Sequence, residues 1–174
     1  MTFMELAHKR FSERHFDPRP VEEEKLQKIL AAGRIAPTAG NYQPQRIYVL
    51  KSPDALEKAR RTKASLYSCP LVLLVCYDSD TVWKNPGDRC YALYNAGEQD
   101  ASIVAASMMF EAEELGIHSL WIRGFDSRSV IDTFELPANH IPVMMLALGY
   151  PDEGSRPSHL HFKRKPLDET VIDL

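Results

Sequence analysis

The chain has 174 residues, 44% hydrophobic and 26% charged, with 21 Lys and Arg against 24 Asp and Glu. This length predicts a single domain, 1–174, and the net charge of −3 gives no positive field for nucleic acid or an anionic membrane. Three cysteines without Cys-x-x-Cys spacing, and apolar runs too short for a signal peptide or a membrane span, favour the reducing cytoplasm.

Three helices and one strand are expected in the amino-terminal part of the chain. Thr2 and Glu5 have the spacing of a capping box, which opens a helix that we expect to reach about Ser12. Pro37 stops the second helix, and Ser52 caps the third. The expected helices cover about 2–12, 22–35 and 53–62, with a short strand at 47–50.

The second half of the chain predicts the centre of the fold. Residues 70–77 are apolar without alternation, as in a central strand whose two faces are both covered by helices. Gly116 ends an apolar helical stripe that we interpret as the central core helix. The expected elements are that helix at about 99–115, strands at 119–123 and 143–148, and between these strands a short helix capped by Ser127.

The carboxyl-terminal segment 151–174 is polar and contains three prolines. Such a segment is not expected to pack on its own chain as a helix pair. We therefore expect it to wrap around a partner, for which a second copy of the chain is the simplest choice.

Several common motifs are absent. No Gly-x-Gly-x-x-Gly loop, no Gly-Lys phosphate loop and no Gly-x-Ser-x-Gly elbow occurs, which argues against the common dinucleotide, Walker-type and hydrolase sites. His159 and His161 have the spacing of two ligands on one strand face, but no third ligand accompanies them, so we expect surface histidines and no metal.

A cationic group lies at the end of the first predicted helix. There, Arg10 and Arg14 are four residues apart and would share a helix face, with the Ser12 hydroxyl between them. This arrangement would suit a phosphate, although cations that answer a helix dipole are an equal alternative. Arg164 adds a cation far along the chain, where a solvated tail is the simpler interpretation.

The order of these motifs resembles the nitroreductase family of FMN-dependent oxidoreductases. The family opens with Arg-x-Ser-x-Arg-x-Phe, which residues 10–16 match, and continues with a helix ending in Ala-Pro-Ser/Thr-x-x-Asn-x-Gln-Pro, which residues 36–44 match. The resemblance to its short-chain members extends from 7 to 171, through stretches at 100–104, 108–109, 114–116, 121–122, 124–126, 136–137, 149–151 and 164–167.

The resemblance implies an α+β, three-layer α-β-α sandwich with a mixed, largely antiparallel central sheet. It also implies a homodimer with two FMN molecules in the interface and the arm 151–174 exchanged between subunits. The residues implied to hold the phosphate and ribityl chain are Arg10, Ser12 and Arg14, with Arg164 at the phosphate. Those implied beside the isoalloxazine ring are Pro37, Thr38, Ala39 and Asn41 of the other subunit, and Ile122, Arg123 and Gly124 at the strand end.

The activity implied by the resemblance is ping-pong transfer of hydride from NADH or NADPH, through flavin N5, to a small acceptor such as a nitroaromatic or a quinone. No catalytic acid or base is required of the protein, because the flavin ring carries the chemistry. A non-catalytic dimer that binds or senses FMN is the alternative, and a structural dimer with a lost site ranks last.

The sequence departs from the family pattern at a few places. Phe11 and Gln45 replace a usual polar and a usual aromatic residue, and Lys63 is the candidate for the cation that many members place near flavin N1. The long insertion that closes the substrate channel in larger members is missing. Trp83, Tyr42 and the loop 85–91 are therefore candidates for a lid, with ordinary loop anchoring as the alternative.

Overall fold

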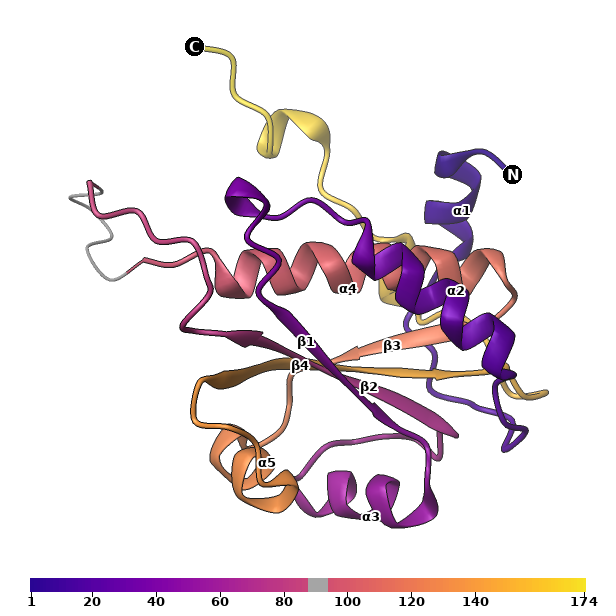
Figure 1. The fold of residues 1–174 in the computed structure, drawn as a ribbon. Coiled ribbons are helices and arrows are strands. Elements are labelled where there is room, and N and C mark those ends of the chain that lie inside the picture. Colours follow the sequence, from indigo (N-terminus) through magenta and orange to yellow (C-terminus); the bar gives the residue numbers. More distant parts are fainter. Residues whose placement is uncertain (88–93) are drawn as a thin grey trace.

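The computed structural model describes residues 1–87 and 94–174, and its centre is a four-stranded sheet (Figure 1). The strand order is β1-β2-β4-β3, and each neighbouring pair is antiparallel. The strands are β1 (Gln45–Leu50), β2 (Leu71–Asp78), β3 (His118–Ile122) and β4 (His140–Gly149). A parallel bridge joins Ser12, which lies outside these strands, to Ser119 of β3. The largely antiparallel α+β fold expected from the sequence is confirmed.

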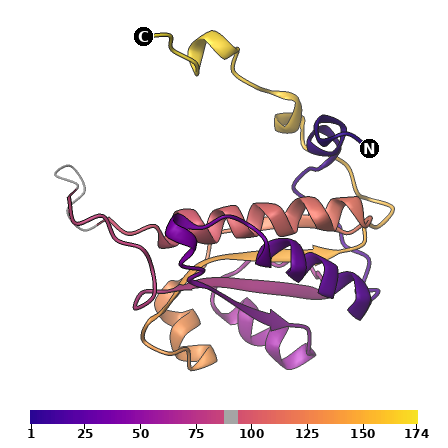
Figure 2. The ribbon, with the colours of Figure 1, turned by 45° about the horizontal axis from the view of Figure 1, so that its top comes forward.

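Helices cover both faces of the sheet and make three layers (Figures 1 and 2). The long α4 packs on one face with α2 beside it, whereas α3 and α5 lie against the other. Within the described part of the chain, no helix is long and apolar enough to cross a membrane. The helices are α1 (Phe3–Lys9), α2 (Glu23–Arg34), α3 (Pro53–Arg61), α4 (Gly97–Glu114) and α5 (Ser127–Phe134).

The two central strands hold the core together. All eight residues of β2 are buried, and alternate side chains point to opposite faces, as the pleat of a strand requires. Leu73 and Val75 join the cluster under α2 and α4, whereas Leu74 and Cys76 join the cluster over α3 and α5. The prediction that 70–77 is a central strand with both faces covered is therefore correct.

Glycine permits close contact at one end of α4 and a left-handed turn at the other. A Cβ on Gly97 would lie 2.3 Å from Cδ2 of Tyr77, so only glycine lets the helix begin directly against that ring. Gly116 follows the helix with φ of 74°, a conformation that glycine adopts without strain. The predicted end of the core helix at Gly116 is thus confirmed.

The first helix is shorter than the sequence predicts. The capping box of Thr2 and Glu5 is present, but the helix ends at Lys9, because Arg10 has an extended backbone with ψ of 125°. The chain then runs beside β3, where the Glu13 N–H donates to the Ser119 carbonyl at 3.0 Å. The prediction of a helix to Ser12 is therefore wrong, and so is the argument that Arg10 and Arg14 share a helix face. A tertiary contact with β3 replaces the last helical turn.

The residue that caps the short helix α5 differs from the prediction. Its cap is Asp126, whose carboxylate accepts from the Ser129 N–H at 2.6 Å, so Ser127 is the first helical residue and not the cap. Both residue types cap well, and the sequence alone favours neither strongly.

The carboxyl-terminal arm leaves the body of the molecule (Figures 1 and 2). It contains two 3-10 turns, His159–Phe162 and Leu167–Glu169, and no α-helix. Its large apolar side chains are exposed at Leu160, Phe162, Leu167, Val171, Ile172 and Leu174. These side chains are available for burial against another surface.

Candidate functional site

A cavity of about 220 Å³ lies where the segment after α1 meets the carboxyl-terminal arm. Three arginines line it, and no carboxylate does. The full lining is Arg10, Phe11, Ser12, Arg14, Ser158, Leu160, His161 and Arg164. The four residues predicted from the sequence to hold a phosphate are therefore brought together, although by an extended segment and not by a helix face.

The electrostatics of this first cavity favour an anion. Burial lowers the pKa of Arg10, the Glu113 carboxylate opposes that effect, and the nearby Arg164 cation adds to it. Arg10 and Arg164 are thus close enough to repel each other, and a bound anion would relieve this repulsion. The Arg14 and Arg164 guanidiniums are held by main-chain carbonyls, at 3.1 Å from Ser12 and 2.7 Å from Lys163 respectively. Both forks are therefore oriented in advance.

A second cavity, of about 200 Å³, adjoins the first, because Arg14 lines both. It lies at the carboxyl end of β3, where Ile122, Arg123 and Gly124 are found as predicted. The other lining residues are Ser65, Tyr67, Leu120 and Trp121. A Cβ built on Gly124 would meet no heavy atom within 4 Å, so the space in front of its backbone is open. The guanidinium of Arg123 lies 5.1 Å from the centre of the Phe125 ring.

The loop predicted to meet the flavin ring from the other subunit lies apart from both cavities in the single chain. Pro37, Thr38, Ala39 and Asn41 are not among the residues that line either one. The buried carboxylate of Asp100, in the first turn of α4, fixes the loop by accepting from the Ala39 N–H at 2.9 Å. Their contribution across a dimer interface stays a prediction.

Several lining residues were missed in the sequence. Ser158 and His161 line the first cavity from the arm, where the sequence suggested only a surface histidine at position 161. Ser65 and Tyr67 line the second cavity from the chain after α3. Tyr67 has φ of 49°, and no glycine marks this turn in the sequence. Lys63, the candidate cation, is not among the residues that line these two cavities.

The predicted lid is described only in part. Trp83 is half-buried against the core, and Tyr42 is 55% exposed. Both side chains lie close to Gly40, so they border the loop that carries Asn41. Residues 88–91 of the predicted lid loop lie outside the described residues.

Comparison with known proteins gives one consistent result. The model of the family described as "Nitroreductase family" matches residues 7–68 and 55–150. A nitroreductase family protein from Clostridium difficile 630, of known crystal structure, is 41% identical, with a TM-score of 0.89 and coverage of 99% of this chain and 98% of that one. An NADH dehydrogenase of Thermus thermophilus is 30% identical over 95% of this chain and 93% of its own length. A nitroreductase family protein from Streptococcus pneumoniae TIGR4 shares the fold, with 22% identity, a TM-score of 0.80 and coverage of 99% of this chain and 100% of that one.

Proposed function

The chain belongs to the nitroreductase family of oxidoreductases, and we propose that it binds FMN and uses NADH or NADPH to reduce a small acceptor such as a nitroaromatic or a quinone. The observation that carries this proposal is the pair of adjoining cavities that share Arg14. One cavity offers three guanidiniums, and the other offers an open glycine backbone at the end of β3.

The residues present fit an FMN molecule. A phosphate carries about −1.5 to −2 charges near neutral pH, and guanidinium forks neutralise such a group with paired hydrogen bonds. Arg10, Arg14 and Arg164 supply those forks, and the Ser12 hydroxyl adds a further donor. A planar ring needs close approach to the backbone, which the open space at Gly124 provides.

FMN would supply the redox chemistry when bound, so that NAD(P)H and the acceptor could react in turn in a ping-pong cycle. The chain's own residues bind and orient it. Arg10, Arg14 and Arg164 would hold the phosphate end, and Ile122, Arg123 and Gly124 would hold the ring in the second cavity. None of these roles requires a catalytic acid or base.

We propose further that the active form is a homodimer. The partner chain would supply Pro37, Thr38, Ala39 and Asn41 to the ring, and the exposed apolar side chains of the arm 151–174 would be buried against it. Ile172, for example, is 80% exposed in the single chain, and covering it and the other apolar side chains of the arm with a second chain would remove their apolar surface from water, which is favourable.

The proposal is tested by spectroscopy. The purified protein is expected to be yellow with an oxidised-flavin spectrum, and NADH or NADPH is expected to bleach it without oxygen. A colourless protein that ignores added FMN contradicts the proposal.

A substitution tests the phosphate assignment separately. Arg10→Ala removes a charge-assisted contact worth on the order of 1.5–3 kcal/mol, so FMN should bind roughly ten- to a hundred-fold more weakly. Unchanged FMN affinity would contradict the assignment of Arg10 to the phosphate site.

A dimer that binds FMN without turnover is the second candidate. It is favoured by Lys63, which lines neither cavity and so leaves the cation near flavin N1 without an assigned residue. Stopped-flow mixing with NADH and NADPH separates the two candidates, because an enzyme bleaches rapidly whereas a sensor shows little change.

A further inference from the structure

A fully buried carboxylate lies inside the cationic segment of the first cavity. Glu13 stands between Ser12 and Arg14, yet its exposed fraction is 0%. An ionised carboxylate is costly to bury unless hydrogen bonds replace its hydration. Its position therefore requires dedicated partners.

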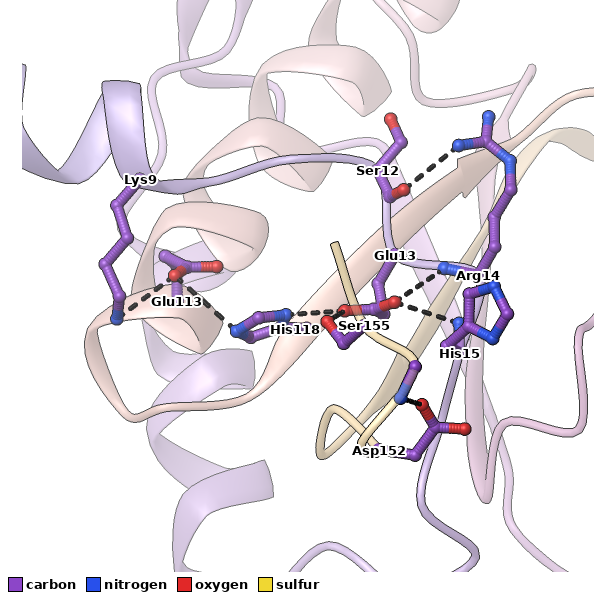
Figure 3. A network of polar contacts seen from close by, with 10 residues as sticks. Lys9, Ser12, Glu13, Arg14, His15, Glu113, His118, Asp152 and Ser155 are labelled. Atoms are coloured by element: carbon purple, nitrogen blue, oxygen red, sulfur yellow. Dashed lines mark hydrogen bonds and ion pairs between the residues drawn. The ribbon is translucent and has the colours of Figure 1, made fainter. Parts of the chain in front are cut away.

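Four donors surround the Glu13 carboxylate (Figure 3). Its Oε1 accepts from the N–H groups of Arg14 and His15, each at 2.9 Å. Its Oε2 accepts from Nδ1–H of His118 at 2.7 Å and from the Ser155 hydroxyl. Burial alone would raise the pKa of Glu13, but these hydrogen bonds together outweigh burial and lower it.

The four bonds tie together parts of the chain that are distant in sequence. His118 is the first residue of β3, and Ser155 follows β4. Glu13 points toward these two residues, whereas the Arg14 side chain turns the other way, toward Ser12 (Figure 3). Glu13 and the Arg14 side chain therefore lie on different sides of the segment.

A second buried carboxylate holds the beginning of the same segment. Glu113 is 1% exposed on α4, and its Oε1 lies 3.1 Å from Nζ of Lys9 and 4.0 Å from Nε2 of His118. The same carboxylate attracts Arg10. Figure 3 shows the resulting chain of contacts from Lys9 through Glu113 and His118 to Glu13. The contacts of Lys9 and Glu13 thus hold the segment at both of its ends.

We propose that Glu13 is a positioning residue for the cofactor phosphate: its buried carboxylate, held by His118 and Ser155, orients the segment so that Ser12 and Arg14 face the first cavity. The inference rests on the proposed function, because it assumes that the first cavity receives the phosphate of FMN. A carboxylate that only stabilised the fold would have no selective effect on that phosphate.

The test compares FMN with riboflavin, which has the same ring and ribityl chain but no phosphate. Fluorescence titrations of the flavin-free full-length chain give both affinities for the wild type, Glu13→Ala, Glu13→Gln and Ser155→Ala. Asp78→Ala is the matched control, because Asp78 is also a buried, hydrogen-bonded carboxylate, but it lies at the end of β2 and not in the segment that carries Ser12 and Arg14.

Glu13→Ala is expected to weaken FMN binding by about ten- to a hundred-fold and to change riboflavin binding by less than about twofold. Glu13→Gln should weaken FMN binding less than Glu13→Ala does, because its amide oxygen can still accept from the Arg14 and His15 N–H groups. Ser155→Ala should weaken FMN several-fold with riboflavin unchanged, and Asp78→Ala should leave the ratio of the two affinities at the wild-type value.

A wild-type ratio in all three site variants overturns the inference, even if their stability falls. If Glu13→Ala does not fold, the ratios of Glu13→Gln and Ser155→Ala decide. If the proposed function is wrong, the wild type itself should bind neither flavin. That result differs from an unchanged ratio in the variants, and it would overturn this inference as well.

Discussion

Gly124 offers a direct test of the ring site, because the folded chain gives no reason for a glycine there. A Cβ at this position would meet no heavy atom within 4 Å, and its φ is not among the positive values. Gly124→Ala should therefore leave the free energy of unfolding unchanged or raise it by about 0.4–1 kcal/mol, since alanine restricts the unfolded chain.

The same methyl group would occupy space that a bound ring needs. Inserting one extra methyl group into a close-packed contact costs about 1–3 kcal/mol, which corresponds to roughly 5- to 150-fold weaker binding. FMN and riboflavin should lose affinity equally, because both carry the ring. This result would differ from that expected for Glu13, where only FMN is affected.

The measurement is a fluorescence titration with both flavins, combined with thermal unfolding of the flavin-free protein. Gly116→Ala is the matched control with the opposite pattern. Its φ of 74° should cost about 1–2 kcal/mol of stability, while flavin affinity stays at the wild-type value. Wild-type affinity of Gly124→Ala for both flavins would refute the placement of the ring in the second cavity.

Three further outcomes are expected. Gly97→Ala should lower the unfolding temperature. Three ring atoms of Tyr77 would lie within 2.5 Å of the new Cβ, so the cost should be near the upper end of about 1–3 kcal/mol, against a gain of at most about 1 kcal/mol in helix propensity. Each kcal/mol is worth about 2–4 °C, and calorimetry that shows no decrease contradicts the close contact. Because hydrogen bonds lower the pKa of Glu13 in the folded chain, the stability it contributes is present above about pH 4.5 and is lost as pH falls through the lowered value. Chemical unfolding at several pH values should thus show that the free energy of unfolding falls less at acid pH in Glu13→Gln than in the wild type. Parallel plots of this free energy against pH would exclude the contribution of Glu13. Deleting 166–174 should shift the chain toward monomer in sedimentation velocity. An unchanged dimer would contradict the proposal that the arm forms part of the dimer interface.

The fold could be read largely from the sequence, because its signals are local and strong. The apolar run at 70–77 and the stripe that ends at Gly116 identify the central strand and the core helix correctly. The end of α1 could not be read in this way. The chain leaves the helix at Arg10 to pair with Ser119, a residue far along the sequence that no local pattern in the first helix identifies.

The candidate site was predicted partly for the wrong reason. Arg10 and Arg14 do line one cavity, but the extended backbone and the buried Glu13 bring them there, not the helical spacing that the sequence suggested. Glu13 occupies an unspecified position of the Arg-x-Ser-x-Arg pattern, so the motif gave no reason to single it out. Tyr67 was missed because a left-handed turn without glycine has no clear sequence signal.

The place of Arg164 in the arm has a consequence for assembly. Arg164 lines the first cavity, and the exposed Leu167 and Ile172 follow it on the same short segment. An anion held by Arg164 restrains that segment and lowers the entropy that must be lost when its apolar side chains are buried against another chain. By thermodynamic reciprocity, association of the arm must tighten anion binding by the same factor. Flavin affinity should therefore rise with protein concentration, and dilution should weaken binding of the cofactor through loss of the dimer.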